Sequence, residues 1–378
     1  MRRIRFVSFC VVALTVSSCK EKFDPPIISS DNSYLVVEGV LNAGSAPTTI
    51  HITRTFGLDQ NSVVQGEIGA TVTVEGKDNS IQPLTMGVLG QYSSPGLILQ
   101  SNAEYRVRIQ TNDGNIYVSG YVMPRQTPGI DSVGWRRSPE GVQLYVNTHD
   151  NSNSTRYYRW DYIETWQLRS YYFSGYIYQN AAVRQRVLPQ EQVYDCWRSA
   201  SSQSILLGSS ARLSNDVINE APLAFYANGD ERMNVRYSLL VRQYAMDKPA
   251  FEFYELMKKN TESVGTIFDS QPSDIRGNII CETDPSKPVI GFITASTISE
   301  KRIFINSSEL PGWNLPPYCP PMTVTPDSIV FYFQGGAYMP YSANFDNLGL
   351  RIISYNASFN TCVDCQTRGG STIQPSFW

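Results

Sequence analysis

The sequence predicts a mainly β protein built from two β-sandwich domains of the immunoglobulin-like or fibronectin-like kind, the second larger and carrying one inserted α-helix. Three observations predict this fold class. Charged residues make up only 17% of the 378 residues, whereas tyrosine alone numbers 23. Short runs rich in Val, Ile, Thr and Tyr recur between clusters of Gly, Pro, Asn and Asp, which is typical of strands joined by turns. Only one stretch, near residues 248–260, shows clear helical periodicity.

The first eighteen residues follow the plan of a lipoprotein signal peptide. Three arginines precede an apolar run over residues 6–16, and two serines lead directly to Cys19. The apolar run is too short to span a bilayer, so no retained transmembrane helix is expected. A cysteine at this position accepts diacylglycerol in lipoprotein processing. We therefore expect residues 1–18 to be removed and Cys19 to be lipidated, which would hold the protein on a membrane.

Residues 19–32 are expected to form a lipid-anchored tether, because they follow neither a strand nor a helix period. Lys20 stands where an aspartate would favour retention in the inner membrane, so sorting to the outer membrane is expected. The charged run over residues 20–24 resembles the short export signal of surface lipoproteins in Bacteroidota. We expect a lipid-anchored protein of the outer membrane at the cell surface, with the periplasmic face as the alternative.

Residues 33–124 are predicted to form an N-terminal β-sandwich domain. Short apolar runs alternate with turn residues along this part of the chain. The clearest hairpin joins residues 105–109 to residues 116–118 through Asp113-Gly114, because this dipeptide supplies the positive φ angles that tight hairpin turns require. Several short strands at this spacing are typical of a small sandwich.

Residues 125–378 are predicted to form a larger C-terminal β domain, since Pro124 and Pro128 interrupt the first strand pattern. Its one helix is expected near residues 248–260, where Asp247 can cap the first turn and Pro249 suits the first helical position. Apolar residues follow there at helical spacing. The expected strands include residues 130–133, 142–146, 157–166, 289–293, 303–305 and 329–333.

The charge balance excludes nucleic acid as an expected partner. The chain has 31 basic and 34 acidic residues and a formal net charge of −3, and removal of residues 1–18 takes away three arginines. Binding to nucleic acid depends on clustered Lys and Arg that neutralise phosphates. A mildly acidic chain without such clusters does not fit that role.

The sequence contains no motif of a catalytic site, metal centre or cofactor site. His51 and His149 lie far apart, and neither a glycine-flanked nucleophilic serine nor a glycine-rich phosphate loop occurs. Carboxylate pairs such as Asp161 with Glu164 could meet in the fold, but a chain with 34 acidic residues offers many such pairs. We therefore expect a protein that is not an enzyme, with no catalytic residues, no metal and no cofactor.

Five cysteines remain besides Cys10 and Cys19, and these candidate disulfide cysteines are Cys196, Cys281, Cys319, Cys362 and Cys365. In an oxidising compartment such cysteines form structural disulfides more often than metal sites. A zinc site at Cys362 and Cys365 would need a second pair of ligands. A thioredoxin-like role does not fit either, because this motif does not open a helix after a strand. Five is odd, so one thiol is expected to be free or to pair unexpectedly, and the connectivity stays open.

Aromatic residues are densest over residues 157–178. Four of them are the candidate binding residues, Tyr158, Trp160, Tyr162 and Trp166. On an extended strand the first three share one face, and Arg159 and Asp161 occupy the other. One interpretation places the rings in a sandwich core. The other makes them an exposed platform for a glycan, peptide or protein partner, since Tyr and Trp give rigid, amphipathic contact area.

The C-terminal run over residues 362–378 resembles the closing signature of a family of uncharacterised Bacteroidota outer-membrane lipoproteins, the domain of unknown function DUF4249. Further matches are Cys196-Trp197 and residues 241–244, 265–269 and 277–279. The resemblance covers nearly the whole mature chain. Genes of this family commonly lie beside TonB-dependent outer-membrane receptors, so the resemblance implies a receptor partner and supplies no catalytic residue. It also implies that Gly369-Gly370 and Phe377-Trp378 dock the chain end into the second domain, locked by a disulfide.

Together these observations predict one function and leave two alternatives. We expect an outer-membrane lipoprotein that acts as a non-enzymatic binding or accessory partner of a TonB-dependent receptor in nutrient capture. The first alternative is a structural or adhesive cell-surface protein without a small ligand. The second is a hydrolase whose site no motif reveals.

Overall fold

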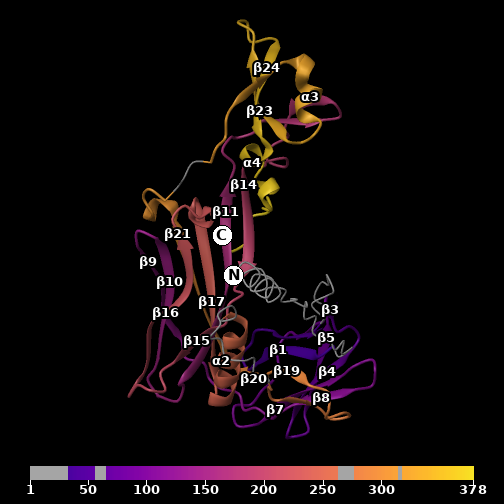
Figure 1. The fold of residues 1–378 in the computed structure, drawn as a ribbon, viewed down its shortest axis with the longest axis vertical. Helices are drawn as coiled ribbons and strands as arrows, with labels where there is room; N and C mark the ends of the chain where they lie inside the picture. The colour runs from indigo at the N-terminus through magenta and orange to yellow at the C-terminus, as the bar shows by residue number, and fades with distance from the viewer. Residues whose placement is uncertain (1–32, 56–64, 263–275, 314–316) are drawn as a thin grey trace, which may run out of the picture.

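The computed structural model describes residues 33–55, 65–262, 276–313 and 317–378. The predicted signal peptide, the tether with Cys19, and the family motif at 265–269 lie outside these residues. The prediction of a mainly β chain is confirmed, and Figure 1 shows the sheets gathered in three units. An N-terminal and a middle unit adjoin each other at the lower end of this view, and a smaller C-terminal unit forms the upper end.

The N-terminal unit is one long, curled sheet of eleven strands. In order across the sheet these are β18 (Ile279–Cys281), β8 (Ile116–Ser119), β7 (Tyr105–Gln110), β4 (Thr71–Gly76), β5 (Ile81–Met86), β6 (Gln91–Ser94), β2 (Thr48–Arg54), β1 (Leu35–Asn42) and β19 (Val289–Gly291), with β20 (Thr294–Ser296) beside β1 and β3 (Gln65–Gly66) beside β2. The outermost strands β18 and β19 contact each other. The sheet therefore closes on itself around one apolar core.

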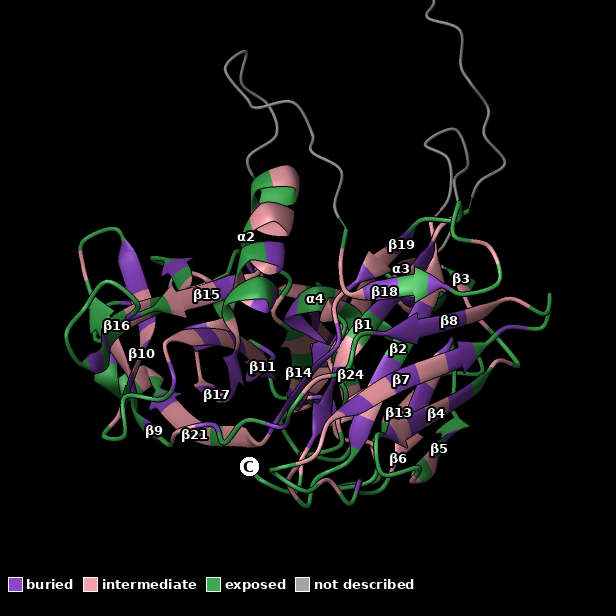
Figure 2. Cartoon of the chain, turned by 90° about the horizontal axis from the view of Figure 1, so that it is seen from below, coloured by how far each residue is buried: buried purple, intermediate pink, exposed green. Residues whose placement is uncertain are grey.

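The predicted hairpin of this unit is confirmed, because β7 and β8 pair antiparallel and Gly114 in the turn has a φ of 84°. Along β7, Tyr105, Val107 and Ile109 are buried, whereas the arginines between them face outward, as the period of two in a strand requires. Figure 2 shows this alternation along the strands of the unit. Burial of one such apolar side chain stabilises the fold by about 1.5–3 kcal/mol.

Residues 279–296 depart from the predicted division of the chain, which placed them in the C-terminal domain. β19 and β20 pair parallel with β1, and β18 pairs with β8, so this distant segment completes the N-terminal sheet. Gly277 lies just before this segment, and a Cβ atom on Gly277 would lie 1.5 Å from the carbonyl oxygen of Gly291. Only glycine permits that approach. Hydrophobic periodicity does not reveal such pairing, because it identifies strands and not their partners.

The middle unit packs two sheets face to face. One contains β16 (Asp216–Ala227), β10 (Gly141–Asp150) and β9 (Ile130–Arg137), and the other contains β14 (Asp195–Ser201), β11 (Tyr157–Arg169), β17 (Arg236–Met246) and β21 (Ile298–Asn306), with β15 (Leu206–Ser209) also paired to β11. The turns η1 (Glu231–Met233) and η2 (Ser307–Glu309) follow β16 and β21. Both sheets contribute to one large apolar core, for example through Leu144 of β10 and Leu239 of β17.

Helix α2 (Lys248–Glu262) confirms the helix predicted near residues 248–260. The carboxylate of Asp247 accepts a hydrogen bond from the backbone N–H of Ala250 at 3.0 Å, which is the cap that the sequence indicated. Ala250 and Phe253 are buried, and Figure 2 shows this burial near the base of the helix. Through these turns α2 packs on β11 and β15 at the junction of the N-terminal and middle units.

The C-terminal unit is small and is assembled from two parts of the chain. Its elements are β22 (Met322–Val324), β24 (Ile352–Phe359), β23 (Tyr338–Phe345), the turns η3 (Pro326–Ser328) and η4 (Cys365–Arg368), the helices α3 (Ile329–Phe333) and α4 (Asn360–Val363), and the hairpin β12 (Tyr176–Gln179) with β13 (Ala182–Gln185). The hairpin comes from the connection between β11 and β14 and packs on β23. Within the described ranges, no helix of any unit is long and apolar enough to cross a membrane.

Four of the five candidate cysteines form two disulfides. Cys319 pairs with Cys362 inside the C-terminal unit, and Cys365 pairs with Cys196, which ties this unit to β14 of the middle unit. Cys281 is buried and free in the N-terminal core. The expectation of disulfides with one thiol left over is thus met.

The strand predicted at residues 329–333 is wrong, because this segment is the helix α3. Pro326 starts a helical turn directly before it. Ile329 and Phe333, four residues apart, pack into the same small cluster, whereas Phe331 is exposed. Periodicity cannot separate a strand from a helix in so short an apolar run. The helical turn at Pro326–Ser328 and the packing of Ile329 and Phe333 on the same side both favour the helix.

The chain end packs against the middle unit. The ring of Trp378 lies 6.4 Å from that of Trp197 and 5.9 Å from that of Phe304. Gly369 adopts a left-handed conformation with φ of 79°, and a Cβ on Gly370 would lie 2.5 Å from the Cβ of Cys196. Both glycines are therefore required where the chain returns to β14, next to the disulfide.

Candidate ligand-binding pocket

The four candidate binding aromatics do not form an exposed platform. Tyr158, Trp160 and Trp166 are 0%, 2% and 4% exposed, and the partly buried Tyr162 packs against the same middle core. The prediction that they present a binding surface is therefore wrong for this strand. The alternative interpretation, in which the rings fill a sandwich core, describes β11.

The physical reason is that the buried polar atoms of two of these rings have partners inside the core. The hydroxyl of Tyr158 donates to the carboxylate of Asp216, and the indole N–H of Trp160 donates to Oε1 of Gln243 at 2.8 Å. Buried Tyr and Trp usually need such partners. Trp166 differs: its indole nitrogen has no partner among the described residues, and Arg198 and Arg232 lie 5.6 and 5.5 Å from its ring.

The later part of the aromatic run belongs to another unit. Tyr172 stacks on Tyr341 of β23 with ring centroids 4.1 Å apart, and its hydroxyl donates to the carbonyl of Cys319. Tyr171 and Phe173 are about half exposed beside it. The fold therefore divides one dense aromatic stretch between two cores.

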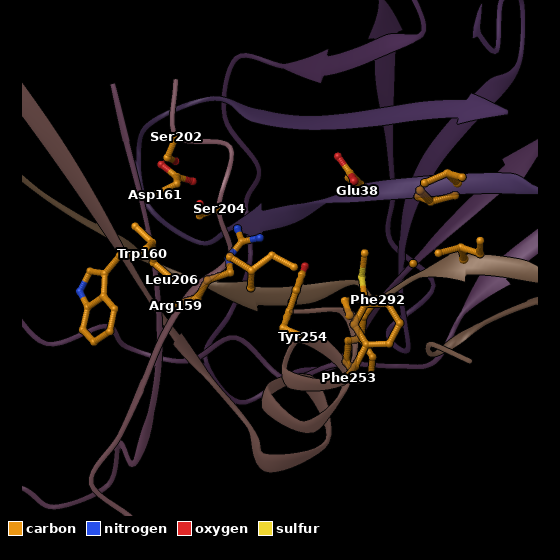
Figure 3. A pocket seen from close by; sticks show the side chains of 16 residues that line it. Glu38, Arg159, Trp160, Asp161, Ser202, Ser204, Leu206, Phe253, Tyr254 and Phe292 are labelled. Atoms are coloured by element: carbon orange, nitrogen blue, oxygen red, sulfur yellow. The ribbon is translucent and has the colours of Figure 1, made fainter. Parts of the chain in front are cut away.

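The opposite face of β11 lines a pocket of about 280 Å³. Arg159 and Asp161 project from this face, as strand alternation predicted. The pocket lies where β1 and β19 of the N-terminal unit meet β11, β15 and α2, and Figure 3 shows its lining residues. Such junctions between structural units are common places for ligand sites.

Arg159 is the central charged group of this pocket. Its guanidinium carbon lies 4.7 Å from the ring centroid of Tyr244 and 5.0 Å from that of Tyr254, which are cation–π distances. Among the described residues, its nitrogens have no hydrogen-bond acceptor and no ion-pair partner. Burial disfavours the cation, but the electrostatic effects of the two tyrosines and of the pocket carboxylates outweigh it and raise the pKa of Arg159. The pocket thus holds a permanent cation with unused donors.

The two carboxylates of the pocket differ in their surroundings. Asp161 accepts hydrogen bonds from Nε of Arg242 at 2.5 Å and from the hydroxyl of Tyr244 at 2.9 Å. It therefore positions Tyr244 beneath the guanidinium. Glu38 on β1 is exposed and, within the described part of the chain, makes no hydrogen bond or ion pair. Figure 3 shows Glu38 and Arg159 reaching into the space from different units.

The remaining wall is largely apolar. Rings and aliphatic side chains line it, with two serine hydroxyls at one side. Phe253 of α2 and Phe292 pack with ring centroids 5.4 Å apart. The apolar lining residues are Val36, Ile205, Leu206, Phe253, Met257, Ile290 and Phe292. One cation, one anion and an apolar wall give the pocket the chemistry of a binding site.

In two other cavities of similar size, the arginines of the lining are paired with carboxylates. In the cavity of about 330 Å³ beside the Cys319–Cys362 disulfide, Arg368 faces Glu231 at 3.6 Å. In the cavity of about 320 Å³ near the start of the described chain, Arg54 pairs with Glu67 at 2.5 Å. Because each of these arginines has a carboxylate partner and Arg159 has none among the described residues, we take the pocket around Arg159 as the candidate site.

The structure does not bring together the other chemical groups that the sequence offered. Asp161 and Glu164 lie three positions apart on one strand and therefore face opposite sides. Glu164 is buried and accepts hydrogen bonds from the hydroxyls of Tyr226 and Tyr237 at 2.5 and 3.0 Å. His149 pairs with Asp131, and in the residues that the structure describes no cluster of three metal-ligating side chains occurs.

Sequence reasoning placed Arg159 and Asp161 on the outer face of the strand but did not identify Arg159 as a binding residue. A signal was present: few residues in this chain are charged, and this arginine stands inside its densest aromatic stretch. Tyr244 could also have been found, because it pairs with Arg159 across β11 and β17. Glu38 and Tyr254 could not, since only the tertiary structure places β1 and α2 beside β11.

The chain matches one of the known family models. The family model described as Domain of unknown function (DUF4249) matches residues 20–302. It spans the pocket residues from Glu38 to Phe292, and it ends before the C-terminal unit that carried the most specific sequence resemblance. No curated protein matches the chain.

Proposed function

The chain belongs to the DUF4249 family, and from this premise we propose that it is a lipid-anchored outer-membrane protein that binds a small ligand as an accessory partner of a TonB-dependent receptor. The observation that carries ligand binding is the junction pocket, in which Arg159 has unused hydrogen-bond donors. The lipid anchor at Cys19 is the reason for placing the protein on the same membrane as such a receptor. Two structural disulfides fit an oxidising compartment.

A surface suited to the receptor lies on the C-terminal unit. The hairpin between β23 and β24 exposes four large apolar side chains, which we call the apolar tip: Phe345, Leu348, Leu350 and Ile353. Leu348 and Leu350 are 79% and 82% exposed. Exposed apolar groups gathered in this way mark contact surfaces for proteins. The hairpin that carries the tip lies at the end of the molecule opposite the N-terminal unit (Figure 1).

Affinity purification from solubilised outer membranes tests the receptor partnership. A tag placed directly before Ser33 leaves the packed Trp378 undisturbed. We expect a receptor barrel to copurify with the wild-type lipoprotein and to be lost with the double variant Leu348→Ser, Leu350→Ser. The control Ile98→Ser changes an equally exposed apolar residue of the N-terminal unit. Failure to recover any receptor with the wild type would overturn the partnership.

The burial of Trp160 and Trp166 favours one alternative function, a structural or adhesive surface protein without a small ligand. With those rings in a core, the exposed apolar tip becomes the main contact surface. Deletion of the gene would then reduce cell adhesion or envelope integrity, and no receptor would copurify. Protease digestion of intact cells further separates a surface location from the periplasmic face, because only a surface protein is cleaved.

A further inference from the structure

We propose that the junction pocket binds a small zwitterion with an apolar body, namely an apolar α-amino acid or a dipeptide, with its carboxylate on Arg159 and its ammonium group on Glu38. This inference rests on the proposed function in that it names the ligand class, and it concerns binding by the lipoprotein alone.

Arg159 supplies the carboxylate site. A guanidinium presents five N–H donors in a planar fork that matches the two oxygens of a carboxylate. The rings of Tyr244 and Tyr254 contact this guanidinium at cation–π distance, and its N–H groups have no acceptor among the described residues, so they remain for a ligand. The cross-strand contact to Tyr244, which Asp161 fixes through its hydroxyl, limits the movement of the side chain. The donors are therefore positioned before a ligand arrives, which reduces the entropy lost on binding.

Glu38 selects against ligands that carry only negative charge. The pocket holds two carboxylates and Arg159, and Arg242 from the adjoining strand neutralises Asp161. The formal charges of Glu38, Asp161, Arg159 and Arg242 therefore sum to zero. A phosphate dianion would add uncompensated negative charge next to Glu38. A zwitterion satisfies both unpaired groups without changing the net charge. The ammonium group of an amino acid would pair with Glu38 from β1 while its carboxylate pairs with Arg159 from β11.

The apolar wall and the volume set the size of the ligand. Phe253 and Met257 of α2, together with Phe292, offer contact area to an aromatic or aliphatic side chain. The volume of about 280 Å³ lies just below the range of pockets that hold drug-sized ligands. A single amino acid or a dipeptide suits this space better than an oligosaccharide. Hydroxyl-rich sugars would also leave many of their polar groups against apolar side chains, which is costly.

Calorimetry on the full-length lipoprotein in detergent tests the assignment with a matched ligand series. The probes are L-phenylalanine, L-leucine and the dipeptide Leu-Leu, compared with 3-phenylpropionate, which lacks the ammonium group, and 2-phenylethylamine, which lacks the carboxylate. Phenyl phosphate represents the dianions. We expect saturable binding of at least one zwitterion, with each truncated analogue about 10- to 100-fold weaker, since each analogue loses the charged hydrogen bond to either Glu38 or Arg159.

Variants then assign the two charges to residues. Arg159→Gln should abolish binding of the zwitterion, and Arg159→Lys should restore part of it. Glu38→Gln should weaken binding of the amino acid but strengthen binding of 3-phenylpropionate, because it removes a negative charge that repels this anion. Arg212→Gln and Glu300→Gln alter exposed groups outside the pocket and serve as controls. If Arg159→Gln fails to fold, the Glu38→Gln variant and the analogue series on the wild type still show whether the pocket binds a zwitterion through both of its charges.

Three outcomes would overturn the inference: no probe binds, the truncated analogues bind as well as the amino acids, or the Glu38 and Arg159 variants bind as the wild type does. The result is separable from the receptor partnership. Recovery of a receptor without amino-acid binding would refute the ligand class and leave the partnership standing. Binding of an amino acid without recovery of a receptor would support the ligand class and refute the partnership.

Discussion

The middle and C-terminal units reach a folded state by different means. Two sheets of the middle unit enclose one large core, within which tyrosine hydroxyls and carboxylates are buried together. The C-terminal unit has two small clusters, one around Val363 and one around Phe333, and a disulfide crosses the first. Small units bury too little apolar surface to be stable by packing alone. A covalent link then supplies the missing stability by restricting the unfolded chain.

The two units are therefore vulnerable to different changes in conditions. The middle unit depends on keeping buried acids and phenols in their proper protonation states, whereas the C-terminal unit depends on the redox state of its cysteines. All tryptophans lie in or against the middle unit, since Trp378 packs on Trp197. Tryptophan fluorescence therefore reports the middle unit. Proteolysis within residues 317–361 reports the C-terminal unit.

The largest expected effect is alkaline unfolding of the middle unit. Burial, together with nearby carboxylates, raises the pKa values of Tyr158, Tyr226, Tyr237 and Tyr244 far above 10. Since the folded pKa values exceed the unfolded value of 10.0, this stability is complete below pH 10 and is lost as pH rises beyond it. Above pH 10, each of these tyrosines lowers the free energy of unfolding by about 1.4 kcal/mol per pH unit, or about 6 kcal/mol for the four at pH 11.

Urea unfolding followed by tryptophan fluorescence between pH 8 and pH 11 measures this loss. Tyr237→Phe removes one titrating group, so it should make the pH dependence shallower even if it lowers stability at pH 8. An unchanged urea midpoint through pH 11 would contradict the proposed dependence on buried phenols.

Removal of the internal disulfide should weaken the C-terminal unit and spare the middle one. In the double variant Cys319→Ala, Cys362→Ala, the lost link spans 43 residues, for which chain entropy predicts a loss of about 4 kcal/mol. Cleavage by trypsin or chymotrypsin within residues 317–361 should become rapid, while the fluorescence melting curve stays close to that of the wild type. Cys281→Ala, which leaves both disulfides intact, is the control. Equal protease resistance in both variants would show that the small clusters suffice.

A third prediction tests hydrogen bonding in the middle core. Trp160→Phe removes the donor to Gln243 and leaves its carbonyl oxygen buried without that partner. We expect a loss of about 2 kcal/mol in the free energy of unfolding, measured by urea denaturation. Trp166→Phe is the matched control, because the indole nitrogen of Trp166 has no partner among the described residues. A larger loss in the control would mean that ring packing outweighs the hydrogen bond.

The smallest effect is expected at the apolar tip. Leu348→Ser should change the free energy of unfolding by no more than about 0.5 kcal/mol, since an exposed side chain contributes little to the folded state. Phe333→Ala in the cluster of the same unit should cost about 3 kcal/mol or more. Thermal melting of both variants under oxidising conditions measures the contrast. A large loss in Leu348→Ser would show that the tip packs within the unit and is not a free contact surface.

Sequence patterns predicted local features well. Asp247 and the apolar spacing after it predicted α2, the Asp113-Gly114 turn predicted the β7–β8 hairpin, and strand alternation placed Arg159 opposite Trp160. Each of these depends on neighbours within a few residues. The error at residues 329–333 has the same origin, because five apolar residues fit a strand and a helix equally well.

The candidate site could be predicted only in part. One of its strands was recognisable, but the opposing wall comes from β1 and β19, whose parallel pairing joins residues that are far apart in the sequence. The sequence also did not show which face of β11 binds a ligand, because Trp160 on one face and Arg159 on the other both have the chemistry of a binding residue. Burial decided between them, because Gln243 and Asp216 satisfy the polar atoms of the rings from within the core.

The mainly β character of the chain and the positions of helix α2 and of the clearest hairpin follow from the sequence alone. So does the odd number of candidate cysteines, which leaves one thiol free or unexpectedly paired. The same sequence carries the pattern from which we predict a lipid anchor at Cys19. These properties follow from composition, local period and the chemistry of single residues. The tertiary structure decided which cysteines pair, which aromatics are core, and that Glu38 faces Arg159 across a pocket. Those outcomes depend on contacts between distant segments, which local patterns do not encode.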